Sequence, residues 1–150
     1  MSEIALPKVD KSILVKKKEI IKSLSKLINS ENILSEADEV RPYETDALSV
    51  YTQTPLAVVL PENTKQVSDI LKYCYKKDIK VVPRGAGTGL SGGALPLQDA
   101  ILLGLGKFNK ILEIDYENKC VVTQPGVTNL GITHAVEHKG FYYAPDPSSQ

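Results

Sequence analysis

The chain contains 150 residues, of which 18 are lysine or arginine and 18 are aspartate or glutamate, so its formal net charge is zero. This length suits one domain with a substantial core, and the balanced charge excludes proteins that bind nucleic acid through an excess of positive charge. Cys74 and Cys120 match no metal-binding spacing and lie in apolar-patterned segments, which predicts two buried thiols. The chain has no apolar signal segment and no apolar run of about 18 residues, so we predict a cytoplasmic protein.

The N-terminal third predicts one helix followed by a loop. Apolar residues recur at intervals of three and four over residues 10–29, which is typical of one helix face, and Asp10 or Ser12 suits the N-cap. Residues 39–54 are polar and bounded by prolines, which predicts an extended loop. The carboxylates in and beside this loop, including Asp46, are therefore expected to be solvated.

A strand–helix–strand unit is predicted next. The apolar run at 57–60 is closed by a proline and indicates a buried strand. Asn63 or Thr64 caps the following helix, and the run at 79–82 indicates a second strand, parallel to the first.

The rest of the chain predicts short strands and one helix. Apolar runs indicate strands at 100–103, 111–114 and 121–123, of which the last two are joined by a turn at 116–119 as an antiparallel hairpin. A helix is predicted over 128–139, with Gly140 ending it. The predicted fold class is α+β, with a small βαβ part followed by a mostly antiparallel sheet.

The most informative segment is the glycine-rich loop, residues 81–93, which reads V-V-P-R-G-A-G-T-G-L-S-G-G. Pro83 is expected to stop the preceding strand. Successive glycine N–H groups form an anion-binding concavity, and glycine lets a ligand approach the backbone closely. Gly87, Gly89 and Gly92 match G-x-G-x-x-G, but the following glycine and proline exclude the helix that a Rossmann site requires. The loop therefore predicts a phosphate site built from its own amides.

One other motif matches a known catalytic pattern. His134, Glu137 and His138 fit H-x-x-E-H, but they lie near the end of the last predicted helix, and the chain has no third histidine. We interpret them as a surface helix and predict no metal site. The residues identify no catalytic group.

The glycine-rich loop resembles the pyrophosphate loop of FAD-linked oxidases of the vanillyl-alcohol oxidase / p-cresol methylhydroxylase type. The segments 112–115, 122–127 and 142–150 extend that likeness, which is greatest to the flavin-bearing subunit of bacterial glycolate oxidase and to D-lactate dehydrogenases of the same group. The resemblance implies an oxidoreductase that oxidises a small 2-hydroxy acid, glycolate or D-lactate, through FAD. It also implies a partner subunit or a membrane-associated electron acceptor, and so a cytoplasmic protein peripheral to the inner membrane.

The same resemblance implies which residues bind the cofactor. The backbone of the loop would hold the pyrophosphate, Ser91 would add a hydroxyl, and Arg84 would be more structural than catalytic. A second segment would pass near the adenine and its ribose, and a third would approach the ribityl chain or the isoalloxazine. The implied FAD-binding residues are Pro83, Arg84, Gly85, Ala86, Gly87, Thr88, Gly89, Ser91, Gly92, Pro125, Gly126, Val127, Pro145, Asp146 and Ser148.

Two departures from the family pattern qualify what the resemblance implies. The loop has no histidine, so the flavin is expected to be bound non-covalently. The family pattern continues past residue 150, so residues 1–30 are predicted to be an N-terminal helical segment and residues 31–150 the N-terminal portion of the FAD-binding domain. The substrate-capping domain and the catalytic residues would then be absent, and this fragment alone would be inactive. A D-2-hydroxyglutarate dehydrogenase-like enzyme and a non-redox nucleotide-binding module remain alternatives.

Overall fold

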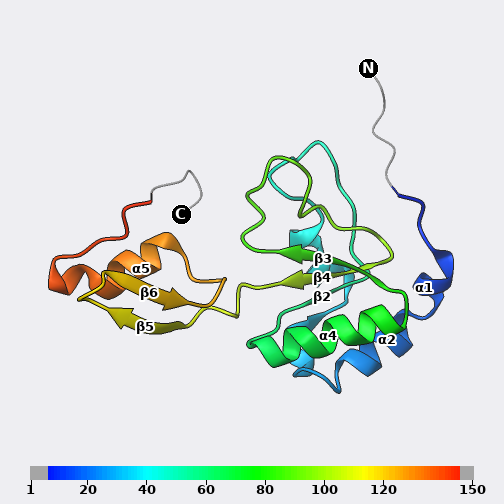
Figure 1. The fold of residues 1–150 in the computed structure, drawn as a ribbon. Helices are drawn as coiled ribbons and strands as arrows, with labels where there is room; N and C mark the ends of the chain where they lie inside the picture. Colours follow the sequence, from blue (N-terminus) through cyan, green and yellow to red (C-terminus); the bar gives the residue numbers. More distant parts are fainter. Residues whose placement is uncertain (1–6, 146–150) are drawn as a thin grey trace.

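The computed structural model describes residues 7–145, which form two units joined by the segment 105–110 (Figure 1). The first unit contains a four-stranded sheet, and the second contains a two-stranded sheet beside one helix. The helices of the first unit are α1 (Lys11–Val15), α2 (Lys17–Leu24), η1 (Ser30–Asn32), α3 (Ala37–Val40), η2 (Arg41–Tyr43) and α4 (Thr64–Lys76). Its strands are β1 (Ile33–Leu34), β2 (Ala57–Val59), β3 (Lys80–Arg84) and β4 (Ala100–Gly104). The second unit contains β5 (Ile111–Asp115), β6 (Cys120–Thr123), α5 (Asn129–Val136) and η3 (Glu137–Lys139).

The four-stranded sheet has the order β1-β2-β4-β3, with β2 and β3 both parallel to β4 and β1 antiparallel to β2. The sequence predicts β2 and β3 as a parallel pair, and they are parallel, but β4 lies between them. Every residue of β4 is buried. A strand covered on both faces belongs in the middle of a parallel sheet, which is why β4 takes the central position.

The two faces of this sheet pack against different elements. Ala57, Val59, Ile101 and Leu103 face a core that includes residues of α2 and α4, and these two helices lie together along one side of the sheet (Figure 1). Val58 and Leu102 point to the opposite face, where Val40 completes a smaller cluster. The alternation follows the two-residue period of a strand and buries β2 and β4 on both sides.

The predicted helix over residues 10–29 is wrong as a single element. Asp10 does cap it, accepting a hydrogen bond from Ser12 N at 2.8 Å, but the helix breaks at Lys16 and α2 ends at Leu24. Asp10 N also donates to the buried Asp99 carboxylate at 2.7 Å, which anchors the start of α1 to the segment before β4. The break lets Ile13 of α1 and Ile20 of α2 reach the same core.

The second unit follows the predicted hairpin and helix closely. β5 and β6 pair antiparallel, and the turn between them is held by Asp115, which accepts hydrogen bonds from the backbone and side chain of Asn118. α5 begins after the N-cap Thr128, and Gly140 ends the final 3₁₀ turn with a φ of 76°. The α+β class is confirmed, while Cys120 is exposed rather than buried. Within residues 7–145, no helix has the length and apolar character needed to cross a bilayer.

Candidate functional site

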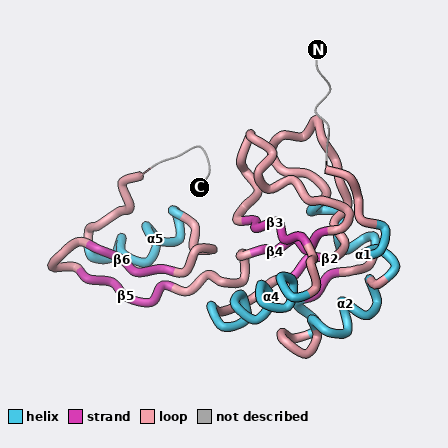
Figure 2. The backbone as a smooth tube through the Cα atoms, turned by 45° about the vertical axis from the view of Figure 1, so that its right-hand side comes forward, coloured by secondary structure: helices cyan, strands magenta, loops and turns pink. Residues whose placement is uncertain are grey.

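The glycine-rich loop follows the edge strand β3, and the next regular element after it is strand β4, not a helix (Figure 2). This confirms that the loop does not form a Rossmann-type turn. Gly87 and Gly92 have φ values of 76° and 73°, a left-handed conformation that disfavours residues with a Cβ. The backbone path of the loop therefore depends on glycine at these two positions.

Pro83 does not stop the strand. β3 extends through Pro83, which lies opposite Leu103 in the parallel register, to Arg84 opposite Gly104. A proline lacks the N–H that a central strand needs, but an edge strand tolerates it. The extension matters because it places the Arg84 side chain at the start of the loop.

Arg84 connects the loop to the segment Tyr43–Leu48. Its Nη1 donates to the carbonyl oxygens of Tyr43 at 3.2 Å and Thr45 at 2.6 Å, and its guanidinium lies 5.7 Å from the centre of the Tyr43 ring. A Cβ built on Gly87 would collide with the guanidinium. The cation thus packs directly against the backbone of the loop.

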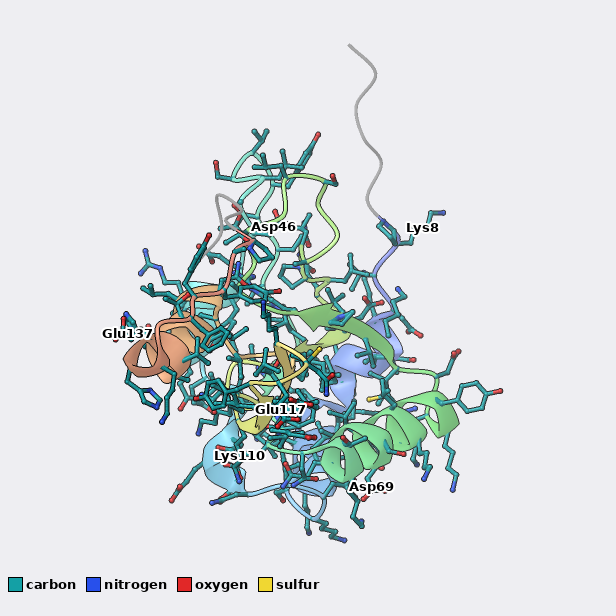
Figure 3. All side chains as sticks on the ribbon, turned by 60° about the vertical axis from the view of Figure 1, so that its left-hand side comes forward. Lys8, Asp46, Asp69, Lys110, Glu117 and Glu137 are labelled. Carbon is teal, nitrogen blue, oxygen red and sulfur yellow. The ribbon has the colours of Figure 1, made fainter. Side chains whose placement is uncertain are left out.

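The segment Tyr43–Leu48 adds a second attachment. Ala47 N donates to Gly87 O at 2.9 Å, and Asp46 Oδ1 accepts from Leu48 N at 2.9 Å. Asp46 lies among the loops above the four-stranded sheet (Figure 3). Its side chain is only 5% exposed, so the expectation of a solvated carboxylate is wrong. The segment Tyr43–Leu48 therefore packs against one side of the glycine-rich loop, which its polar sequence did not indicate.

The amides of the loop are available to a ligand. The N–H groups of Gly85, Ala86, Gly87 and Gly89 donate no hydrogen bond to any other residue within 7–145. These four amides are unpaired donors within the described residues, as an anion site requires.

A cavity of about 430 Å³ joins the start of this loop to the turn after β6. It is lined by Gly85, Ala86, Gly106, Asn109, Pro125, Gly126, Val127, Thr128 and Asn129. Gly126 is needed here because a Cβ would meet the carbonyl oxygens of Leu105 and Phe108, and its N–H donates to Phe108 O at 2.9 Å. The cavity thus combines two segments about 40 residues apart in sequence, at the junction of the two units, a common place for a ligand site.

The structure brings five of the predicted residues together in this cavity: Gly85, Ala86, Pro125, Gly126 and Val127. Thr88, Gly89, Ser91 and Gly92 lie further along the loop and outside it, while Pro145 is exposed in the C-terminal segment. Asp146 and Ser148 fall outside the described residues.

Four lining residues were not predicted: Gly106, Asn109, Thr128 and Asn129. Gly106 and Asn109 follow β4, and residues after the carboxyl end of a parallel strand often line a ligand site. Had the sequence analysis placed β4 in the parallel sheet, it would have indicated these two residues. Thr128 is the N-cap of α5 and accepts a hydrogen bond from Gly131 N at 3.0 Å. The sequence could predict that it starts a helix, but not that it lines the cavity.

The H-x-x-E-H motif lies away from this cavity. His134, Glu137 and His138 are exposed along α5 and η3, with Glu137 on the outer side of the helix (Figure 3). Within residues 7–145 no three potential ligands are grouped as a metal ion would need. The motif takes no part in the candidate site.

Comparison with known proteins identifies the family. The sequence model of the FAD binding domain matches residues 55–150. This chain belongs to the FAD-binding domain family. It is 48% identical over 146 residues to glycolate oxidase subunit GlcD of Escherichia coli K12, covering 97% of this chain and 28% of that protein. It is also 31% identical over 115 residues to mitochondrial D-2-hydroxyglutarate dehydrogenase of Arabidopsis thaliana, covering 77% of this chain and 21% of that protein.

The fold agrees with this assignment. The crystal structure of p-cresol methylhydroxylase with substrate bound superposes with a TM-score of 0.73 at 25% identity, covering 88% of this chain and 26% of that one. The predicted relationship, the p-cresol methylhydroxylase-type fold and FAD as the cofactor of the family are thereby confirmed. The chain spans less than a third of the length of these relatives.

The residues present fit the diphosphate part of FAD. The loop has unpaired amides, two of its glycines have positive φ, and a guanidinium lies against it. Each of these features suits a doubly charged anion held by backbone groups.

Proposed function

We propose that this chain forms part of the FAD site of an oxidoreductase that oxidises a small 2-hydroxy acid, glycolate or D-lactate, to the 2-oxo acid. The observation that carries the proposal is the cavity shared by Gly85–Ala86 and Pro125–Val127. The resemblance in sequence independently implies that both segments contact FAD. The identity to GlcD supports the substrate class, since that relative is named a glycolate oxidase subunit.

The residues divide into three groups in this proposal. The backbone from Pro83 to Gly89 and the Ser91–Gly92 turn hold the diphosphate, and Arg84 supports that backbone from beneath. Pro125, Gly126 and Val127 border the adenine–ribose side. Pro145, Asp146 and Ser148 approach the ribityl chain or the isoalloxazine, a role that rests on the resemblance alone.

The chemistry comes from the cofactor, and this chain contributes binding and orientation. When bound, FAD accepts the two electrons that the 2-hydroxy acid loses on oxidation. The loop amides would stabilise the negative charge of the diphosphate through hydrogen bonds, and the cavity walls would exclude water from one side of it. Binding is non-covalent, because no histidine lies in the loop. The electrons pass on to a partner subunit or a membrane-associated acceptor, and the protein is cytoplasmic or peripheral to the inner membrane.

Two alternatives are separated by the ligand and the substrate. A D-2-hydroxyglutarate dehydrogenase-like enzyme shares the same FAD site, and the Arabidopsis relative favours it. It would differ in the groups that bind the second carboxylate of the substrate. A non-redox nucleotide-binding module would use the same loop for the diphosphate of a sugar nucleotide.

The test is a ligand titration of the purified 150-residue chain. Bound flavin absorbs near ~370 and ~450 nm, so copurified cofactor is visible directly. FAD, riboflavin and UDP-glucose are then titrated while the backbone amides are followed by ¹⁵N NMR. We expect FAD to bind, to move the amides of Gly85–Gly89 and to bind more tightly than riboflavin, which has no diphosphate. Tighter binding of UDP-glucose than of FAD, or unmoved loop amides, would refute the proposal.

A further inference from the structure

The two units are joined by a β-turn that is tied to both of them. Phe108 N donates to Leu105 O at 2.9 Å and closes the turn over residues 105–108. At the first residue of the turn, Leu105 N donates to Arg84 O at 2.9 Å, which attaches it to the end of β3 in the first unit. At its last residue, Phe108 O accepts from Gly126 N at 2.9 Å, which attaches it to the second unit. This turn is therefore the joint between the units (Figure 1).

One side chain of the turn makes a third attachment, back to the first unit. Lys107 Nζ donates to Asn32 Oδ1 at 2.5 Å, across 75 residues of sequence. Asn32 is buried, its backbone O accepts from Leu60 N at 2.9 Å, and its Nδ2 donates to Glu62 Oε1 at 3.0 Å. Only one orientation of this amide presents its oxygen to the ammonium group and its nitrogen to the carboxylate. Glu62 therefore fixes the Asn32 amide in the orientation that binds Lys107.

The orientation of this turn determines how the walls of the cavity face each other. Gly85–Ala86 of the first unit form one wall, Pro125–Asn129 of the second form the other, and Gly106 and Asn109 lie between them. With Leu105 as its only attachment to the first unit, the turn could rotate there and carry the second unit with it. The bond from Lys107 gives the turn a second attachment to the first unit, and two attached residues define an orientation that one leaves open.

We propose that Lys107 is a positioning residue, whose bond to Asn32 holds the second unit in the orientation that forms the cavity. The inference rests on the proposed function only for the identity of the ligand, because the orientation of the units is a property of the ligand-free chain. The apparent Kd of a ligand rises in inverse proportion to the fraction of molecules that are competent to bind it. A bond that holds the binding orientation therefore lowers the Kd without touching the ligand.

Three variants separate the bond from the charge of the lysine. Lys107→Met keeps an unbranched side chain and loses the donor, whereas Lys107→Arg keeps both a donor and the positive charge. Lys110→Met is the matched control, because Lys110 lies in the same connecting segment, is exposed like Lys107 and carries the same charge. Its side chain forms no hydrogen bond or ion pair with any residue in the range 7–145. A merely structural Lys107 predicts a lower melting temperature with the units still in one orientation.

The measurement is a set of residual dipolar couplings of the backbone amides in the ligand-free 150-residue chain, which report the alignment of each unit separately. We expect one alignment to describe both units in the unmodified chain and in Lys110→Met. In Lys107→Met the second unit should show a different or weaker alignment than the first, and Lys107→Arg should restore the shared one. Titration with FAD should then give a Kd raised by up to about fivefold in Lys107→Met, the effect of losing one hydrogen bond. Lys110→Met should stay within about twofold of the unmodified chain, as expected for an exposed charge.

The couplings and the titration test separate conclusions. A shared alignment in Lys107→Met, or separate alignments already in the unmodified chain, would overturn the positioning role and leave the FAD site intact. An equal change in Lys110→Met, or no restoration by Lys107→Arg, would also overturn it, since charge or side-chain identity would then explain the effect in place of the bond. If the alignments change as expected but FAD binds to none of the proteins, the proposed function fails while the role of Lys107 stands.

Discussion

Replacing Gly87 with valine tests the backbone conformation of the loop and its contact with Arg84 together. At a φ of 76°, a residue with a Cβ costs about 1–2 kcal/mol. The new side chain also occupies the place of the guanidinium, which is the flexible end of a side chain and moves away. Arg84 then gives up two charge-assisted hydrogen bonds at roughly 1.5 kcal/mol each. The total is about 4–5 kcal/mol, a large loss for a single substitution.

Gly140→Val is the control, because Gly140 has the same φ of 76° but no atom within 4 Å of its Cβ position. For a chain of this size, 1 kcal/mol corresponds to roughly 2–4 °C in Tm. We expect Gly140→Val to melt about 3–6 °C lower, and Gly87→Val about 12–15 °C lower. Gly87→Val should also abolish FAD binding, measured by titration below both melting transitions. Equal melting of the two variants would refute the Arg84 contribution, and retained FAD binding would refute the loop assignment.

Two further predictions concern groups outside the site. Burial raises the pKa of Cys74 to about 11, whereas Cys120 is exposed. Iodoacetamide at pH 8 should therefore alkylate Cys120 in the folded chain and Cys74 only after unfolding. Mass spectrometry reports the order of alkylation, and equal rates for the two cysteines would contradict the fold. Burial acts to raise the pKa of Asp99, but hydrogen bonds from Lys80 Nζ and a backbone N–H outweigh it and hold that pKa below its ordinary value. The stabilisation is present above the unfolded pKa of about 3.9 and disappears as the pH falls through the lower folded pKa. Asp99→Asn should therefore lower the free energy of unfolding by about 2–3 kcal/mol at pH 7, with a smaller difference at pH 3 in urea melts, and a pH-independent difference would contradict it.

The sequence predicted the elements whose signals are local. α4 has an asparagine cap that accepts from Gln66 N at 3.0 Å, η3 ends at a glycine in the left-handed region, and the turn before β6 carries the polar residues that close a hairpin. Each signal acts within a few residues, so tertiary contacts did not override it. The glycine-rich loop belongs to this group, because its glycines report a backbone path directly.

The sequence could not predict features that depend on distant partners. β4 is an apolar run like β2, and periodicity alone does not say which strand pairs with which. The start of α1 is anchored by a hydrogen bond from Asp10 N to Asp99, a contact across 89 residues that no local pattern reports. The polar composition of residues 39–54 predicted a solvated loop. The contact with Arg84 is made by backbone carbonyl groups, which every residue has, so the composition of the segment could not indicate it.

The candidate site therefore contains two kinds of wall. One kind is made by the glycines Gly85, Gly87, Gly89, Gly92 and Gly126, whose lack of a side chain is visible in the sequence. The other kind is the Tyr43–Leu48 segment, which contributes backbone atoms and one aromatic ring. Because Arg84 and Ala47 link the two through Gly87, the loop is shaped before a ligand arrives, which lowers the ordering cost of binding. A glycine-rich loop without such a wall would spend part of its binding free energy on becoming ordered, so Tyr43–Leu48 is as much a determinant of affinity as the glycines themselves.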